Sequence, residues 1–137
     1  MSAEEMKAKI RRVFDEAYNK GNVDVLDELF AADFVLHMSL YPDIKGLEVL
    51  KQHIADLRSS YSDIQFTIGE IIIEGNRSAM RFTFRGTHKE QGKQVIVPEC
   101  LVWHLVKGKI VEEWAYADQL GFLQQIGVVP PIGQSKE

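Results

Sequence analysis

Cysteine is almost absent from this 137-residue sequence, in which Cys100 is the only one. A single thiol excludes an intrachain disulfide, and a zinc site would need other types of ligand. The sequence also lacks any apolar run near the roughly 18 residues of a membrane span, and its acidic N-terminus lacks the apolar core of a secretory signal. Basic residues number 16 against 20 acidic ones, whereas nucleic-acid binders usually carry a basic excess. We therefore expect a cytoplasmic domain that binds neither membranes nor nucleic acid.

Familiar catalytic and cofactor-binding motifs are also missing. The sequence contains no zinc-protease helix motif, no nucleophile elbow, no phosphate-binding loop and no dinucleotide fingerprint. The four histidines lie far apart and show no metal-ligand spacing: His37, His53, His88 and His104. We therefore expect no cofactor and no metal, and look for a site that works with its own side chains on a small apolar molecule.

The hydrophobic pattern changes its period part-way along the chain. Residues 3–59 show helical spacing, starting at a capping box of Ser2 and Glu5, with one short strand near 34–38. From residue 64 to 118 the period is two, which predicts a meander of antiparallel strands with a hairpin turn at Gly75 and Asn76. A C-terminal turn and tail occupy 119–137. The order predicts a single α+β domain over residues 1–137, a curved sheet with helices on one face.

The strand over residues 95–106 is apolar on both of its faces. Val95, Val97, Leu101, Trp103 and Leu105 alternate with Ile96, Cys100, Val102 and Val106. A sheet that is apolar on both faces needs two covers. The helices can supply one, and a second subunit is the natural candidate for the other. We expect a homodimer that forms through the sheet.

Asp118 is the first candidate for chemistry, at the end of the last long strand. By parity it shares a strand face with Glu112, Trp114 and Tyr116. A carboxylate among aromatic side chains in a hollow is desolvated, which raises its pKa and suits it to proton transfer. The alternative is structural, because an aspartate just before a helical turn is usually an N-cap.

Two histidines and an arginine are further candidates. His37 lies on the short early strand and is either an acid or base or a packed, hydrogen-bonded side chain. In the strand that ends at His88, this histidine and Arg81 fall on opposite faces, so both can line one pocket only if a bulge near Gly86 changes the register. The sequence alone leaves that choice open.

The order of elements and several motifs together resemble the SnoaL-like polyketide cyclases, within the nuclear-transport-factor-2-like, cystatin-like α+β superfamily. The resemblance runs from about residue 4 to 129. The motifs that carry it are Phe34-Val35-Leu36-His37, Tyr61-Ser62-Asp63-Ile64, Gly86-Thr87-His88 and Gly108-Lys109-Ile110-Val111-Glu112-Glu113-Trp114, followed by Asp118 and the pattern Gly121, Leu123, Gln125, Ile126, Gly127.

This resemblance implies a conical pocket and a cofactor-free intramolecular aldol cyclisation. It implies that Asp118 is the acid and base, with His37 and His88 beside it, and that Arg81 and Trp114 are pocket positions. Tyr116 and Trp103 are the remaining residues that we expect to bind substrate. The expected function is therefore a cyclase, isomerase or lyase acting on an apolar carbonyl compound. There are two alternatives. The protein is a non-catalytic binding protein of the same fold, or its conical pocket is filled by its own aromatic side chains.

Overall fold

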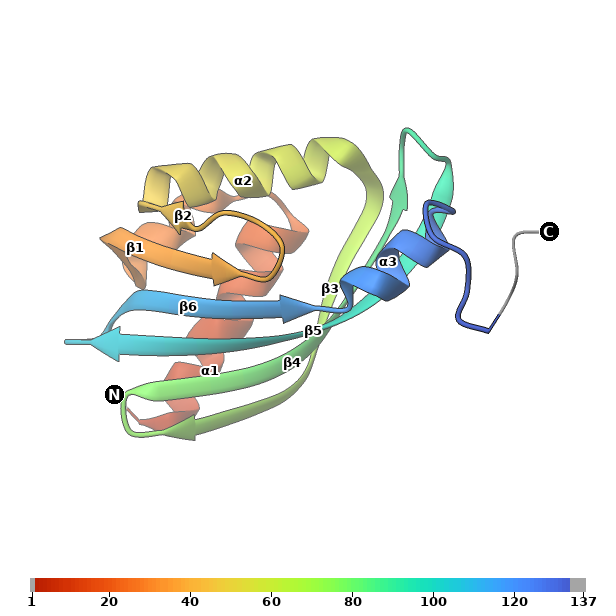
Figure 1. The fold of residues 1–137 in the computed structure, drawn as a ribbon. Coiled ribbons are helices and arrows are strands. Elements are labelled where there is room, and N and C mark those ends of the chain that lie inside the picture. The colour runs from red at the N-terminus through yellow and green to blue at the C-terminus, as the bar shows by residue number, and fades with distance from the viewer. Residues whose placement is uncertain (1, 134–137) are drawn as a thin grey trace.

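The computed structural model describes residues 2–133, and the expected tail beyond Gly133 lies outside the described residues. Helices and strands follow the predicted order, helices first and then a strand meander (Figure 1). The helices are α1 (Ala3–Arg12), the π-helix η1 (Val13–Asn19), the 3-10 helix η2 (Val23–Glu28), α2 (Leu47–Ser60) and α3 (Gln119–Gln125). The strands are β1 (Phe30–Met38), β2 (Ile44–Lys45), β3 (Tyr61–Glu74), β4 (Arg77–His88), β5 (Lys93–Val106) and β6 (Lys109–Ala117).

The first helix begins at the predicted capping box. The Ser2 hydroxyl accepts a hydrogen bond from the backbone N–H of Glu5 at 3.1 Å. The helix then widens into η1 and ends before Gly21, whose φ of +81° is the left-handed conformation that suits glycine. The apolar face of this long helix is buried against the sheet through Met6, Ile10, Val13, Phe14 and Ala17.

Six strands form one curved, open sheet in the order β2-β1-β6-β5-β4-β3. All neighbours are antiparallel except β1 and β6, which run parallel. Two elements differ from the expectation: β1 begins at Phe30 rather than near residue 34, and a second short strand, β2, follows at Ile44–Lys45 within the stretch expected to be helical. Both differences come from long-range strand pairing, of Phe30 with Ile110 on β6 and of β2 with β1, which a local hydrophobic pattern does not show.

The register of β4 with β5 is regular through Gly86, so β4 itself has no bulge there. Strand β4 pairs with β5 residue by residue from Arg77 to His88. The register shifts lie in β3, where the one between Ser62 and Gln65 is opposite Gly86, in the pairing of β1 with β6, and near Leu105. As a result Phe82, Phe84 and His88 keep to the face covered by the helices, and Arg81 lies on the other.

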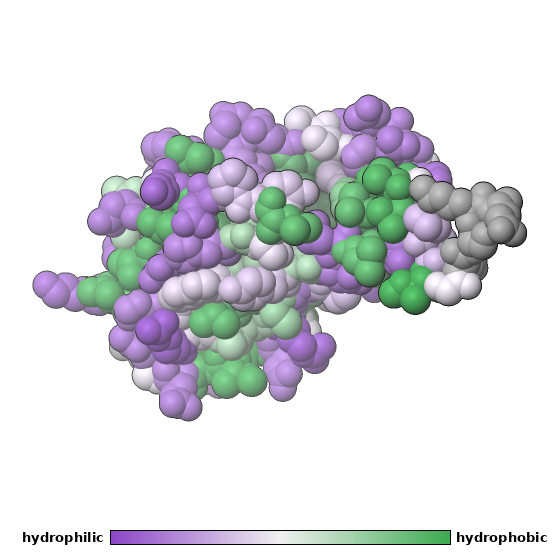
Figure 2. Space-filling view, viewed as in Figure 1, coloured by the Kyte–Doolittle hydropathy of each residue, from purple (hydrophilic) through white to green (hydrophobic). Residues whose placement is uncertain are grey.

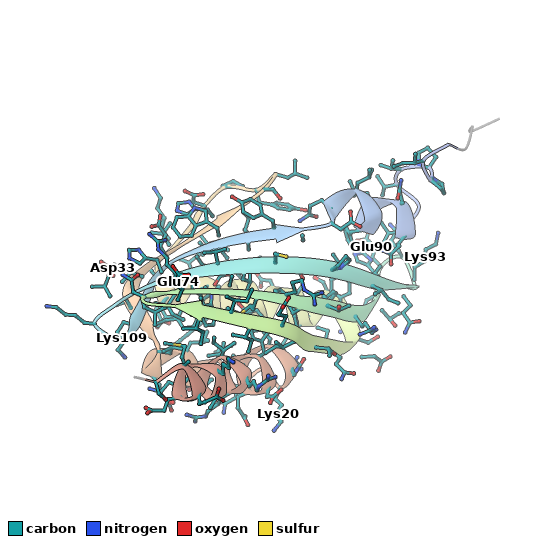
Figure 3. All side chains as sticks on the ribbon, turned by 90° about the horizontal axis from the view of Figure 1, so that it is seen from below. Lys20, Asp33, Glu74, Glu90, Lys93 and Lys109 are labelled. Atoms are coloured by element: carbon teal, nitrogen blue, oxygen red, sulfur yellow. The ribbon has the colours of Figure 1, made fainter. Side chains whose placement is uncertain are left out.

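The helices cover only one face of the sheet, which we call the inner face; the opposite one is the outer face. Helix α1 lies behind the strands in Figure 1, and in Figure 3 the same helix lies to one side of the sheet with side chains filling the space between. Aromatic rings from η1 and the strands pack there, with Phe14 at 5.0 Å from both Tyr18 and Phe82, centroid to centroid. Among residues 2–133, no helix is both long and apolar enough to cross a membrane.

Candidate functional site

Two glutamates lie on the inner face, among the residues of the core. Glu113 on β6 is 2% exposed, and its Cα is paired with that of Trp103 on the neighbouring strand β5. The indole Nε1 of Trp103 donates a hydrogen bond to Glu113 Oε1 at 2.7 Å. Glu99 lies four residues before Trp103 on β5, so strand alternation places both on the same face. Glu99 is half-buried and pairs with Ala117 at the end of β6.

The surroundings of these carboxyl groups favour their neutral forms. Burial raises the pKa of Glu113 to about 7, although the hydrogen bond from Trp103 acts in the opposite direction. Burial also raises the pKa of Glu99, to about 8, and the negative charge of Glu113 adds to that rise. Two carboxyl groups that exchange protons near neutrality can therefore serve general acid and base chemistry.

Tyr18 on η1 faces these glutamates from the helical side. Burial raises the pKa of its hydroxyl well above the usual value, and the charges of Glu113 and Glu99 raise it further. Its ring lies against those of Phe14 and Phe66, at 5.0 Å and 5.1 Å. The phenol therefore stays protonated and is a potential hydrogen-bond donor beside an acidic pair.

The end of the helix that carries Tyr18 is held by two polar contacts. The guanidinium of Arg58 donates from Nη1 to the carbonyl oxygens of Tyr18 and Asn19, at 2.7 and 2.8 Å. The Asn19 side chain accepts from the N–H of Phe66 at 2.6 Å and donates to its carbonyl at 3.1 Å. These bonds join η1 to α2 and β3 and fix Tyr18 relative to the sheet.

His88 lies on the inner face at the end of the sheet where α3 packs. Its ring lies 5.2 Å from that of Tyr61 and 6.4 Å from that of Phe122 on α3. Its Nδ1 accepts a hydrogen bond from the N–H of Gln91 at 3.1 Å, which leaves Nε2 as the N–H tautomer when the ring is neutral. The orientation of His88 is thus set by the loop that follows β4.

Asp118 occupies the N-cap of α3, the structural alternative that its sequence position suggested. Its Oδ1 accepts from the N–H of Gly121 at 2.9 Å, and the side chain is exposed. Its own N–H donates to the carbonyl oxygen of Pro98 at 3.1 Å, next to Glu99. Asp118 therefore lies near Glu99 in the sheet, but its carboxylate caps the N-terminus of α3.

His37 and Trp114 lie on the outer face, away from His88. The two are Cα partners across β1 and β6, and their rings are 5.4 Å apart. His37 Nε2 lies 2.6 Å from Glu112 Oε2, and its Nδ1 lies 3.0 Å from Asp43 Oδ2. The hydrogen bond with Glu112 is the largest influence and raises the pKa of His37; burial opposes it, and the hydrogen bond with Asp43 adds a smaller rise. The expected placement of His37 and His88 in one hollow is corrected, because strand alternation separates them.

Arg81 and Tyr116 also lie on the outer face. Arg81 Nε lies 3.2 Å from Glu70 Oε1 on β3, and both side chains are well exposed. Tyr116 is 55% exposed. Between them is a shallow hollow of about 180 Å³ lined by residues of β3, β4, β5 and β6: Gly69, Arg81, Phe82, Thr83, Pro98, Glu99, Cys100 and Tyr116. Of the residues expected to bind substrate, Trp103 alone therefore shares the inner face with the glutamates.

Glu99 and Glu113 were not among the predicted site residues. The signal for Glu99 is present in the sequence, since it has the parity of Val97, Leu101 and Trp103 and is charged in an otherwise apolar row. Glu113 is next to Trp114 in the strand and therefore faces the opposite side. Because we expected Trp114 to line the pocket, Glu113 was expected to point away from it. Among residues 2–133, no group of three or more acidic, histidine or cysteine side chains could hold a metal ion.

A family model for the SnoaL-like polyketide cyclases matches residues 8–126. The chain belongs to the SnoaL-like polyketide cyclase family. The match begins within α1 and extends through the end of α3. No match was found among curated protein sequences.

Solved structures with the same fold include other SnoaL-like proteins. A candidate SnoaL-like cyclase from Jannaschia sp. CCS1 is 21% identical with a TM-score of 0.80, covering 90% of this chain and 92% of its own. TsrD from Streptomyces laurentii is 20% identical with a TM-score of 0.85, covering 94% and 99%. IdmH from Streptomyces antibioticus, a candidate polyketide cyclase, is 25% identical with a TM-score of 0.76, covering 89% and 98%. Family and fold together support a function of the cyclase or isomerase type.

Proposed function

We propose that this SnoaL-like protein is a cofactor-free enzyme that closes a ring in, or isomerises, an apolar carbonyl compound by proton transfer. The observation that carries the proposal is the pair Glu99 and Glu113 on the inner face, two carboxyl groups with pKa values of about 8 and about 7 in an aromatic environment. Apolar surroundings favour an apolar substrate, and a titratable pair near neutrality supplies the proton chemistry.

Glu99 is the group that we assign to the proton transfer. Glu113 is 2% exposed and accepts the indole hydrogen bond, whereas Glu99 is half-buried. In its ionised form Glu99 removes a proton from the carbon next to a carbonyl. The resulting enolate carbon attacks a second carbonyl of the same molecule, a carbon–carbon bond forms, and the alkoxide takes the proton back from Glu99. Protons balance over the cycle, and Tyr18 donates a hydrogen bond to the developing oxyanion.

Asp118 is the second carboxylate that we test, because the family resemblance assigns the acid and base to this position. Its backbone bond to Pro98 puts it near Glu99, at the end of the sheet where His88 lies. Loss of the bond to Gly121 would release its carboxylate for catalysis. His88 is then the hydrogen-bond donor to the substrate oxygen, through Nε2.

The first experiment is a thermal-shift screen against flat, apolar carbonyl compounds, followed by turnover assays on the compounds that bind. We expect Glu99→Gln to lower kcat by about 10²–10⁴-fold, the usual contribution of a general acid or base. Glu112→Gln is the matched control, since Glu112 precedes Glu113 on the same strand and faces outward. It should leave turnover unchanged.

Each other outcome has a defined meaning. Loss of turnover in Asp118→Asn with full activity in Glu99→Gln would move the acid and base to Asp118. Full activity in both would refute proton transfer by these carboxylates. Binding without turnover of any ligand would support the alternative of a non-catalytic binding protein, and no binding at all would support an interior filled by Phe14, Phe66, Phe82 and Phe84.

A further inference from the structure

Tyr61 is a second phenol on the inner face, and the proposed reaction does not use it. It follows the last residue of α2, begins β3 and is 9% exposed. Its Cα partner on β4 is His88. The ring packs edge-on against those of Phe84 and His88, at 5.0 Å and 5.2 Å between centroids. The phenol therefore has a fixed position at the end of the sheet where α3 packs.

A β-bulge brings this ring to the inner face. Tyr61 and Phe66 are five residues apart, so regular strand alternation would place them on opposite faces. The pairing with β4 shifts between Ser62 and Gln65, and Asp63 within this stretch has a φ of +54°. Phe66 is consequently buried on the same face as Tyr61. A bulge of this kind redirects a side chain and is frequent beside functional sites.

The backbone around Tyr61 is shaped to receive its ring. A Cβ at Gly86 would lie 3.2 Å from Cζ of Phe84 and 3.3 Å from Cδ1 of Tyr61, so a larger residue there would displace one of the rings. The N–H of Lys89 donates to the carbonyl oxygen of Ser60 at 3.0 Å, which fixes the start of β3 against the loop after β4. Glycine and loop together hold Tyr61 where the bulge directs it.

Four inner rings form a continuous series, which we call the aromatic row: Tyr18, Phe66, Phe84 and Tyr61. Successive centroids are 5.1, 4.9 and 5.0 Å apart. The row has a phenol at each end and apolar rings between them. Near the Tyr61 end, Figure 2 shows apolar surface gathered over α3, where Leu120 is 46% exposed. Flat apolar molecules pack well on such rings.

Both phenol hydroxyls are available as hydrogen-bond donors. Among residues 2–133, Tyr18 is bonded through its backbone carbonyl, and no hydrogen bond engages the hydroxyl of Tyr18 or Tyr61. Burial raises the pKa of Tyr61 to about 12, and the charges of Tyr41 and Glu99 add to that rise. Glu99 acts on Tyr18 as well, so it lies within electrostatic reach of both phenols. A largely buried donor without an acceptor is costly, and a ligand oxygen can supply the acceptor.

We propose that Tyr61 donates a hydrogen bond to a second oxygen of the substrate, and that the substrate is a flat apolar compound with an oxygen function at each end. The reacting carbonyl lies at Tyr18, the far oxygen lies at Tyr61, and the carbon skeleton lies along Phe66 and Phe84. This inference rests on the proposed function for the reacting end, where Glu99 acts, and adds recognition of the far end. A compound without the far oxygen leaves a buried donor unpaired, so the site discriminates against it.

Two matched compounds test this recognition. 2,6-Diacetylnaphthalene and 2-acetyl-6-ethylnaphthalene share a flat skeleton, and only the first has an oxygen at both ends. We expect the native protein to bind the diketone about tenfold more tightly, in Kd measured by titration calorimetry. Tyr61→Phe keeps the ring and should lose this preference. A merely structural role of Tyr61 would weaken both compounds in parallel, and that result would overturn the proposal. Equal affinities in the native protein, or no binding of the diketone, would also overturn it.

Tyr41→Phe is the matched control. Tyr41 is a phenol near enough for its charge to act on Tyr61, but it is 53% exposed and lies outside the aromatic row. The same chemical change there should leave the preference for the diketone intact. Loss of the preference in Tyr41→Phe with its retention in Tyr61→Phe would overturn the assignment to Tyr61.

Gly86→Ala tests the position of the hydroxyl without removing it. The added Cβ pushes on the rings of Tyr61 and Phe84, so we expect a reduced preference for the diketone in a protein whose thermal denaturation remains cooperative. An unchanged preference in the folded variant would overturn the fixed placement of Tyr61.

Affinity is measured without turnover, so this proposal and the proposed function fail separately. A preference that Tyr61→Phe abolishes, in a protein that turns over no compound, would support this recognition site and refute the proton-transfer chemistry. Turnover that falls in Glu99→Gln, with a preference that Tyr61→Phe leaves unchanged, would support the chemistry and overturn the role of Tyr61.

Discussion

Trp103 and Glu113 face each other across β5 and β6, and the indole N–H donates to the carboxyl group at 2.7 Å inside the core. A buried carboxyl group without a partner is costly, so this contact explains how a glutamate is tolerated beside Leu36, its Cα partner on β1, in the core. It also gives the two inner glutamates different roles, because the indole hydrogen bond holds Glu113 in place and does not hold Glu99. The candidate acid and base therefore lies near a second carboxyl group whose position is fixed.

Removal of this hydrogen bond should destabilise the fold and change the titration of Glu113. In Trp103→Phe the aromatic volume is largely kept, but the donor is lost. We expect the free energy of unfolding at pH 7 to fall by about 1–3 kcal/mol and the pKa of Glu113 to rise above about 7. Urea denaturation and NMR titration of the carboxyl group measure the two effects. Glu113→Gln keeps an acceptor for the indole, and a loss of stability in it as large as that in Trp103→Phe would contradict this account.

Stability should fall as the pH rises from about 4.5 to about 8. The folded pKa of Glu99 is raised from 4.5 to about 8, so the folded state binds more protons than the unfolded state in that range. Deprotonation of Glu99 therefore favours unfolding. Thermal denaturation at several pH values should show a falling Tm in the native protein and a flatter profile in Glu99→Gln. An identical slope in both proteins would show that the Glu99 carboxyl group is solvated.

His37 should titrate above its usual value and lose that shift when Glu112 is neutralised. Its hydrogen bond with Glu112 favours the charged imidazolium. The stabilisation is fully present below pH 6.5 and is lost as the pH rises through the folded pKa of His37. NMR titration of the ring protons should give a pKa above 6.5 in the native protein and a lower one in Glu112→Gln. Asp43→Asn should have the smaller effect, and the reverse order would contradict the assignment.

Asp118 substitutions should separate its helix cap from any role in catalysis. Asparagine is as good an N-cap as aspartate, so Asp118→Asn should keep the stability of the native protein, whereas Asp118→Ala should lose about 1 kcal/mol. Denaturation curves measure both. A large loss of turnover in Asp118→Asn at full stability would identify a chemical role. Parallel losses of stability and activity that occur only in Asp118→Ala would identify a purely structural one.

The sequence by itself determined the class of fold, most element boundaries and the family. These depend on local signals: the capping box at Ser2, the change of period after residue 60, and the turn at Gly75, which adopts a positive φ of 57°. It also determined that both faces of β5 are apolar. Such signals come from residues close in the chain, where spacing and backbone preference act directly.

The tertiary structure decided which face of the sheet the helices cover, and with it the content of the site. Parity alone groups Trp114 with Asp118 and Trp103 with Glu99, but it does not say which group faces inward. Packing of α1 and η1 on the side of Trp103 buries Glu113 and leaves His37, Trp114 and Arg81 outside. Long-range pairing brings the two glutamates to neighbouring strands, and burial then changes their acidity. Desolvation depends on all the atoms that surround a group in the folded protein, so it cannot be predicted from any single stretch of sequence.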